Sequence, residues 1–179
     1  MEIIAIAAIS LDGLITRHAQ EGTGFASPED GQFFRQALQT FDCSLMGRRT
    51  YKVSRERILA NLSPERLRIV RTHHPEVFAA DALQERLEFT SAPLSEILDD
   101  LRARGKRRCA VLGGTSIYSE CLQNNWMDEL WVTLEPLGFG SGKRLLEGEL
   151  SVRFSLKSLE HLSPDTLLLK YKLLRDAVR

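Results

Sequence analysis

The sequence predicts an α/β fold in which helices cover both faces of a mixed, mainly parallel β-sheet. Short apolar runs recur along the chain, and segments with helical periodicity separate them. The N-terminal runs are continuously apolar, which is typical of parallel strands covered on both faces. Near the C-terminus, FSLKSLEHL alternates between apolar and polar residues, and the turn-forming Ser163-Pro164-Asp165 separates it from TLLLKYKLL. These two segments predict an antiparallel hairpin.

The strands should follow the apolar runs in chain order. The first run, IIAIAAI, lacks the basic residues and the cleavage pattern of a leader peptide, so we expect a strand there. No run approaches the ~18 apolar residues that a membrane span needs, and we expect no membrane partner. The expected strands cover residues 3–9, 43–47, 67–72, 87–90, 109–114 and 129–135, and the C-terminal hairpin follows them.

Three helices are expected between the strands. The first begins at SPED (27–30), which combines a capping Ser, Pro at the first helical position and a carboxylate three residues after the cap. The second begins at Pro93 and ends at Gly105, and the third is capped by Thr115 or Ser116. The apolar face of the first helix consists of Phe33, Phe34, Ala37, Leu38 and Phe41.

The composition indicates a locally built binding site in one domain. The chain has 179 residues, so we expect a single domain over residues 1–179. Lysine and arginine total 24 residues, and aspartate and glutamate also total 24, which gives no general attraction to nucleic acid or to an anionic membrane. Cys43, Cys109 and Cys121 lie in apolar stretches without a C-x-x-C pair. This pattern indicates free thiols and a cytoplasmic protein.

The stretch VLGGTSIY (111–118) contains the most informative turn. A parallel strand that ends at Gly113-Gly114 and passes directly into a helix leaves backbone N–H groups and the positive helix end facing outward. That geometry suits a phosphate or pyrophosphate. Because Thr115 follows the glycine pair, the stretch is not the usual dinucleotide fingerprint, and no P-loop Lys is present. A tight turn without a ligand is the alternative interpretation.

Two other expected strand ends carry cations and hydroxyl groups. In MGRRTY, the arginine forks and the threonine hydroxyl follow a glycine and could clamp a phosphate, although most arginine pairs are only solvated surface charges. Ligands bind at the carboxyl ends of strands in open α/β sheets, so three such ends favour a functional interpretation. The residues concerned are Gly47, Arg48, Arg49 and Thr50 after one strand and Arg71 and Thr72 after the next.

Asp30 has two competing interpretations. It shares a helical face with several phenylalanines, so it could be a partly desolvated acid with a raised pKa that delivers a proton near neutral pH. Alternatively, it closes a capping box with Ser27. His73 and His74 have no further ligands at a supporting spacing, so we expect no metal site.

Taken together, these motifs resemble the dihydrofolate reductase fold and, more closely, the reductase domain of bifunctional riboflavin-biosynthesis deaminase-reductases. The resemblance covers nearly the whole chain and implies a three-layer α/β/α arrangement. The zinc signature of the deaminase half is not complete, since no P-C-x-x-C occurs in the sequence. The segments that carry the resemblance are AAISLDGLIT (7–16), SPEDGQFF (27–34), MGRRTY (46–51), VLGGTSIY (111–118) and MDELWVTLEPLGFGSGKRLL (127–146).

The resemblance implies an NADPH site across the strand ends. The glycine turn would lie under the pyrophosphate and the nicotinamide side. Gly47, Arg48, Arg49 and Thr50 would be the turn and helix start that grip the other phosphates. The end of the third strand would lie near the adenosine 2′-phosphate, which favours NADPH over NADH. A cis peptide bond is also implied between Gly113 and Gly114. The cofactor-binding residues would be Ala8, Ile15, Gly47, Arg48, Arg49, Thr50, Arg71, Thr72, Gly113, Gly114, Thr115, Ser116, Ile117 and Tyr118.

The same resemblance implies which residues meet the substrate. Asp30 matches the acidic residue of the dihydrofolate reductase substrate pocket, and Thr133 matches its hydroxyl partner on a neighbouring strand. These two residues would supply or organise the proton. Phe25 stands where dihydrofolate reductases have a tryptophan. The substrate-binding residues would be Asp12, Phe25, Phe34 and Glu135.

The implied function is that of an NADPH-dependent reductase of a small pyrimidine-type heterocycle, most like 5-amino-6-(5-phosphoribosylamino)uracil reductase. A pterin or dihydrofolate reductase is one alternative, and a non-catalytic NADPH-binding protein with this fold is another. The aspartate that often follows the GRRTY-like motif in the riboflavin enzymes is missing from KVSRERILANLS. Because the related reductases pair as dimers, we expect a homodimer with the C-terminal hairpin as its candidate interface.

Overall fold

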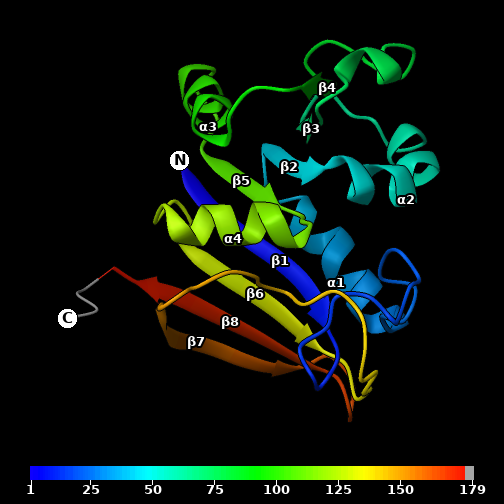
Figure 1. Ribbon diagram of the computed structural model, residues 1–179, viewed down its shortest axis with the longest axis vertical. Helices are drawn as coiled ribbons and strands as arrows, with labels where there is room; N and C mark the ends of the chain where they lie inside the picture. Colours follow the sequence, from blue (N-terminus) through cyan, green and yellow to red (C-terminus); the bar gives the residue numbers. More distant parts are fainter. Residues whose placement is uncertain (176–179) are drawn as a thin grey trace.

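One eight-stranded β-sheet organises the chain. The computed structural model describes residues 1–175, and the strand order in the sheet is β4-β3-β2-β5-β1-β6-β8-β7 (Figure 1). The strands are β1 (Glu2–Ile9), β2 (Cys43–Gly47), β3 (Leu67–Arg71), β4 (Leu87–Thr90), β5 (Arg108–Val111), β6 (Glu129–Leu134), β7 (Arg153–His161) and β8 (Leu167–Leu174).

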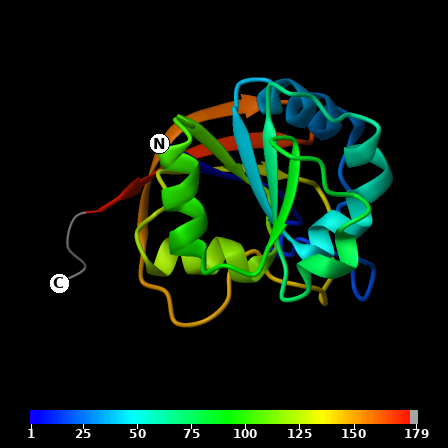
Figure 2. The ribbon, with the colours of Figure 1, turned by 90° about the horizontal axis from the view of Figure 1, so that it is seen from above.

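The sheet is mixed and mainly parallel, as the sequence predicts. β1 to β6 pair in parallel, whereas β8 is antiparallel to β6 and β7 is antiparallel to β8. The C-terminal hairpin therefore closes one end of the sheet, and β7 is its edge strand. Figure 2 shows the twist, since the strands at the β4 end run at a steep angle to those at the β7 end.

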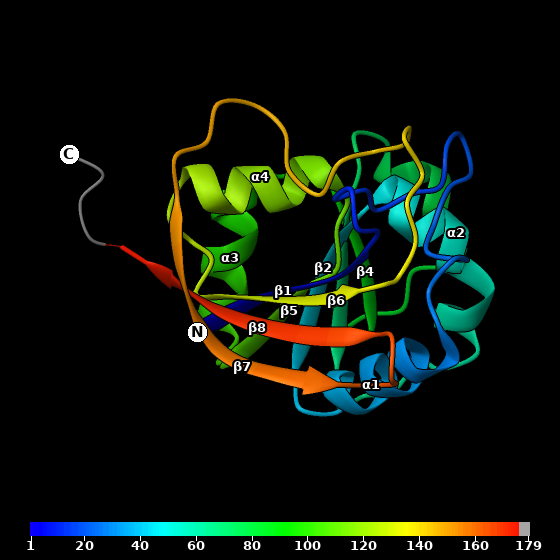
Figure 3. The same ribbon diagram turned by 90° about the horizontal axis from the view of Figure 1, so that it is seen from below.

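Helices cover both faces of the sheet, which gives the expected three layers. Figure 3 shows α3 and α4 on one side of the sheet and α1 on the other. None of the helices in the described residues is long and apolar enough to cross a membrane. The helices are α1 (Pro28–Leu38), α2 (Arg48–Leu59), α3 (Leu94–Ala103) and α4 (Thr115–Gln123), with a short 3₁₀ helix, η1 (Pro75–Phe78).

The core lies on both faces because successive strand residues point in opposite directions. In β1, Ile3 and Ala5 belong to the buried cluster that includes residues of α3 and α4. Ile4 and Ile6 point the other way and belong to the cluster that includes Ala37 of α1. Burial on both faces explains why these strands are continuously apolar in the sequence.

The structure corrects two expectations about helices. It contains α2, whose start at residues 47–50 the resemblance implied but which was not among the three helices expected from the hydrophobic pattern. Only Tyr51 of its twelve residues is fully buried, so the hydrophobic periodicity is weak. The N-cap of α4 is Gly114, without a side-chain cap, so the expected Thr115 or Ser116 cap is wrong. The Thr115 hydroxyl instead donates to the carbonyl oxygen of Arg144 at 2.6 Å.

Candidate active site

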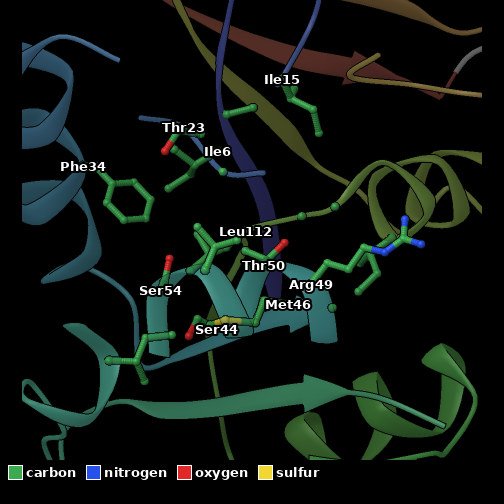
Figure 4. A pocket seen from close by; sticks show the side chains of 18 of the residues that line it. Ile6, Ile15, Thr23, Phe34, Ser44, Met46, Arg49, Thr50, Ser54 and Leu112 are labelled. Atoms are coloured by element: carbon green, nitrogen blue, oxygen red, sulfur yellow. The ribbon is translucent and has the colours of Figure 1, made fainter. Parts of the chain in front are cut away.

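A cleft of about 2180 Å³ runs along the carboxyl ends of β1, β2, β3 and β5 and continues between α1 and α2. Figure 4 shows Ile6 and Phe34 facing across this cavity from Met46 and Ser54. All the residues expected to bind the cofactor line the cleft, whereas Thr133 of β6 does not. The strand ends that the sequence singled out are therefore brought together.

The glycine pair forms the turn at the centre of the cleft. The Gly113-Gly114 peptide bond is cis, which confirms that expectation. The Gly47 N–H donates to the Gly113 carbonyl at 2.7 Å, so the end of β2 is tied to the turn after β5. Gly113 has a φ of +99°, and a Cβ there would lie 3.0 Å from the Tyr118 hydroxyl oxygen. Both facts require glycine at position 113.

Two helix N-termini meet at this turn. Gly47 is the N-cap of α2 and Gly114 is the N-cap of α4, and neither helix start has a side-chain cap. A Cβ on Gly47 would lie 3.5 Å from Ile117 Cδ1 and 3.7 Å from both the Gly113 oxygen and the Gly114 nitrogen. Gly47 and Gly114 both line the cleft, so the space at this turn is bordered by backbone and by two positive helix ends. Such a space fits the pyrophosphate of a dinucleotide.

The arginines around the turn differ in their partners. Arg48 and Arg49 are exposed at the start of α2 and form no ion pair within residues 1–175. The Arg71 guanidinium, by contrast, donates to the Glu120 carboxylate of α4 at 2.5 Å. Sequence reasoning treated Arg71 as a free phosphate clamp and missed Glu120. Thr72 is buried, and its hydroxyl oxygen accepts a hydrogen bond from the His74 N–H at 3.2 Å.

The cleft extends from the glycine turn to the end of β1. Ala8 and Ile15 line the cleft on that side, and Figure 4 shows Ile15 at its rim. The buried Tyr118 hydroxyl donates to the carbonyl oxygen of Ile6 at 2.7 Å, and burial raises its pKa. Tyr118 is thereby held as a neutral ring wall between α4 and β1.

Asp30 lines the cleft from the first turn of α1, and its carboxyl is not used for capping. The Ser27 hydroxyl oxygen accepts from the Asp30 N–H, but the Ser27 N–H donates to Glu135 rather than to Asp30. Burial, with a smaller contribution from the negative charge of Glu135, raises the pKa of Asp30. The nearby Thr133 hydroxyl partly offsets that rise, although this buried group has no partner at direct hydrogen-bond distance within residues 1–175.

Three of the four expected substrate contacts, Asp12, Phe25 and Glu135, are not among the residues that line the cleft. The Asp12 carboxylate accepts hydrogen bonds from the Ser10 hydroxyl at 2.6 Å and from the Gly140 N–H at 2.7 Å, which lowers its pKa to about 2.

The hydrogen bond between Asp12 and Gly140 joins the loop after β1 to the loop after β6. Phe25 packs edge-on against Phe139, with the ring centroids 5.0 Å apart. Glu135 is buried against Ser27 and Thr166. Phe34, the fourth expected substrate contact, does line the cleft (Figure 4).

The family relationship of the chain follows from a match to a known domain. The model of the RibD C-terminal domain matches residues 1–168. The chain belongs to the RibD C-terminal domain family. No curated protein sequence matches it.

Solved structures share the fold of this RibD-type domain. A putative riboflavin biosynthesis protein from Shewanella sp. PV-4 is 23% identical over 98% of this chain and 100% of its own, with a TM-score of 0.70. A diaminohydroxyphosphoribosylaminopyrimidine deaminase/5-amino-6-(5-phosphoribosylamino)uracil reductase from Thermotoga maritima is 18% identical over 97% of this chain and 56% of its own, with a TM-score of 0.76. The dihydrofolate reductase from Enterococcus faecalis complexed with NADP(H) and RAB-propyl is 20% identical over 98% of this chain and 97% of its own, with a TM-score of 0.63.

This RibD-type domain also has a basic region that the sequence analysis missed. Arg68 is only 3% exposed, and its guanidinium donates to the carbonyl oxygens of Arg66 and Asn61 rather than to a carboxylate. Burial and the neighbouring Arg66 lower its pKa to about 10. The Arg66 Nε atom is buried without a hydrogen-bond partner within residues 1–175. The arginines that line this part of the cleft are Arg35, Arg57, Arg66, Arg68, Arg107 and Arg108.

The one feature of the sequence that indicates this basic region is RLR at residues 66–68, at the start of an expected strand. The buried Arg68 and the half-buried Arg66 both donate to backbone carbonyl oxygens and form no ion pair within residues 1–175. No three His, Cys, Asp or Glu side chains come together as a metal-binding group in the part of the chain that the structure describes. The arrangement therefore offers cationic groups and helix N-termini for anion binding, together with Asp30, an acid whose pKa burial raises.

Proposed function

We propose that this RibD-type domain is an NADPH-dependent reductase of a small pyrimidine-type heterocycle, most like 5-amino-6-(5-phosphoribosylamino)uracil reductase. The observation that carries the proposal is the meeting of two uncapped helix N-termini at the glycine turn, in the same cleft as Asp30. One feature suits a dinucleotide and the other suits proton delivery to a bound heterocycle.

The cofactor residues would divide into three groups along the strand ends. The pyrophosphate would lie on the glycine turn, against Gly113, Gly114, Thr115, Ser116 and Ile117. Gly47, Arg48, Arg49 and Thr50 would hold the other phosphates, with Arg71 and Thr72 beyond them. The nicotinamide would lie beside Ala8, Ile15 and Tyr118. NADPH supplies the hydride in such a site.

Asp30 would hold the proton for the reaction. Its raised pKa keeps a larger fraction of the carboxyl protonated than an exposed Asp would have. The Thr133 hydroxyl lies close enough to affect the ionisation of Asp30, so it would orient the acid, directly or through one bridging water. Phe34 and Ile6 would exclude bulk water from the space between the acid and the nicotinamide face.

The basic end of the cleft favours a substrate with an anionic substituent. Arg68 is buried without a carboxylate, and an anion in the cleft would compensate that charge. Arg35 and Arg57 line the same region from α1 and α2 and form no ion pair within residues 1–175. A phosphoribosylamino substituent would place its phosphate there, whereas a plain heterocycle would leave the arginines unused.

Paired assays of NADPH oxidation test the proposal. The phosphoribosylaminopyrimidine should be reduced with a higher kcat/KM than its dephosphorylated form, and both should exceed dihydrofolate. Faster reduction of dihydrofolate would instead support the pterin alternative, which the Asp30 and Thr133 pairing also suits. NADPH binding without turnover of any of these substrates would favour a non-catalytic protein.

We also propose a cytoplasmic homodimer. The three cysteines of the described residues are free and buried, which suits a reducing compartment. Leu156 and Leu159 of the edge strand β7 are each 50% exposed, so a second copy could cover the hairpin. Light scattering of the purified protein should give twice the chain mass, and Leu156→Asp should give the mass of one chain.

A further inference from the structure

An ion pair spans the cleft at the end of β3. The Arg71 Nη1 atom lies 2.5 Å from the Glu120 Oε2 atom, which joins the last residue of β3 to α4 across 49 residues of sequence. The two side chains are 29% and 31% exposed, and both line the cleft. The pair is therefore open to a ligand and is not part of the buried core.

The strand order locates this pair relative to the proposed cofactor. β5, β2 and β3 are neighbours in the sheet, so the glycine turn, the start of α2 and Arg71 follow one another along its carboxyl edge. A dinucleotide with its nicotinamide near Ala8 of β1 and its pyrophosphate on the glycine turn must extend its adenosine half toward β3. Arg71 and Glu120 lie on that side.

The charges at the adenosine side do not all favour a phosphate. Arg48, Arg49 and Arg71 supply three positive charges, but Glu120 neutralises the last of them. A 2′-phosphate on the adenosine ribose would approach the Glu120 carboxylate as a like charge, whereas a free 2′-hydroxyl could donate a hydrogen bond to it. The same carboxylate thus opposes NADPH and accepts NADH.

We infer that Glu120 sets the discrimination between NADPH and NADH by holding the Arg71 guanidinium against α4. This inference rests on the proposed function, because it requires a nicotinamide dinucleotide in the cleft. Glu120 weakens the preference for NADPH below the level that three free arginines would give. Removal of the carboxylate frees Arg71 for the 2′-phosphate and strengthens that preference.

Calorimetric titration of NADPH and NADH into wild type, Glu120→Gln and Glu147→Gln tests the inference. Glu147 also lines the cleft but forms no ion pair within residues 1–175, so its variant controls for the loss of one negative charge. The ratio of the NADH Kd to the NADPH Kd should rise about tenfold in Glu120→Gln, through tighter NADPH binding, and change less than about twofold in Glu147→Gln.

Further variants separate a role in discrimination from a structural role. Adding Arg71→Gln to Glu120→Gln should abolish the gain in NADPH affinity, because the freed guanidinium is then absent. Glu120→Ala should reproduce the Glu120→Gln ratio, and apo melting curves report whether each variant is folded.

Three results would overturn the inference. An unchanged ratio of the NADH Kd to the NADPH Kd in a folded Glu120→Gln that still binds NADPH would show that the ion pair only connects β3 to α4. An equal change in Glu147→Gln would indicate a general charge effect. Wild type that binds neither dinucleotide would contradict the proposed function itself, and the inference with it.

Discussion

The Glu135 carboxylate accepts hydrogen bonds from both the backbone N–H and the hydroxyl of Ser27, at 2.8 and 2.9 Å. A helix that starts with Ser and has Asp three residues later would ordinarily use that Asp to accept from the Ser N–H. Here Glu135, from the segment after β6, takes that place. Asp30 is consequently left to face the cleft with a raised pKa.

The first prediction concerns the stability of this contact. Glu135 is 2% exposed and accepts from Ser27 and from the Thr166 hydroxyl. Glu135→Gln replaces one acceptor oxygen by an NH₂ group, which leaves buried donors unpaired, so the free energy of unfolding should fall by about 1–3 kcal/mol. Glu29→Gln, at an exposed position in α1, should change the free energy of unfolding by less than about 1 kcal/mol in the same urea titration. Equal effects of the two variants would refute this account of Glu135.

The second prediction concerns proton delivery by Asp30. Asp30→Asn removes the acid but keeps the side-chain shape, so kcat at neutral pH should fall about 100-fold or more. The NADPH Kd should change little, because Asp30 lies away from the glycine turn. In the wild type, kcat/KM should decline as pH rises through the raised pKa of Asp30, and the variant should lack that decline. Unchanged turnover in Asp30→Asn would exclude Asp30 as the proton source.

The third prediction concerns the pH dependence of stability. Burial raises the pKa of Asp30 in the folded state above the ordinary value of 3.8, so ionised Asp30 destabilises the fold at neutral pH. The contribution of Asp30 to stability is full below pH 3.8 and is lost as pH rises through the folded-state pKa. Asp30→Asn should therefore melt at a higher temperature than wild type at neutral pH, and the difference should shrink as the pH falls to 3.8. A difference that is constant across this range would contradict the raised pKa.

The fourth prediction separates ligand binding from folding at the glycine turn. Gly47 has a φ of −83°, and an added Cβ would meet its nearest neighbour at 3.5 Å, so Gly47→Ala should fold with a stability change below about 1 kcal/mol. The methyl group would occupy the space above the turn, and NADPH affinity should fall about tenfold or more. Gly138→Ala, whose Cβ would meet nothing within 4 Å, is the matched control. An unchanged NADPH affinity in Gly47→Ala would show that the pyrophosphate does not bind at this turn.

The fifth prediction concerns the basic end of the cleft. Arg35→Gln should raise the KM for the phosphorylated substrate about tenfold and leave the KM for NADPH unchanged, since a charge-assisted contact to the phosphate is lost. Arg153→Gln, which removes an exposed arginine outside the cleft, should change neither value. An effect on NADPH alone would assign Arg35 to the cofactor rather than to the substrate.

The sequence predicts the sheet well because strand burial leaves a direct mark on composition. The expected strand at residues 43–47 coincides with β2, and the alternating C-terminal segments form β7 and β8. The hydrophobic pattern did not predict α2, because its segment, RRTYKVSRERIL, buries only one residue completely and is mostly polar. A polar, charged segment of this kind can form either a helix or a loop, and its tertiary contacts determine which.

The site was harder to predict than the fold, because its polar contacts join distant segments. The glycine turn is local and could be read from the sequence. The hydrogen bonds of Asp12 to Gly140 and of Glu135 to Ser27 could not be predicted, because these partners lie 128 and 108 residues away. The pairing of Arg71 with Glu120 likewise joins residues 49 positions apart, at the end of β3 and in α4. Local sequence carries no information on which carboxylate reaches which donor.

Transfer of deuterium from NADPH to product tests the central claim most directly. Wild-type protein would be incubated with the phosphoribosylaminopyrimidine and with NADPH that carries two deuterium atoms at C4 of the nicotinamide. Mass spectrometry would then give the mass of the product. The account predicts a reduced product that carries one deuterium, and at least about 100-fold less of this product with Asp30→Asn in the same time. Bound NADPH with no deuterated product from the wild type would contradict it.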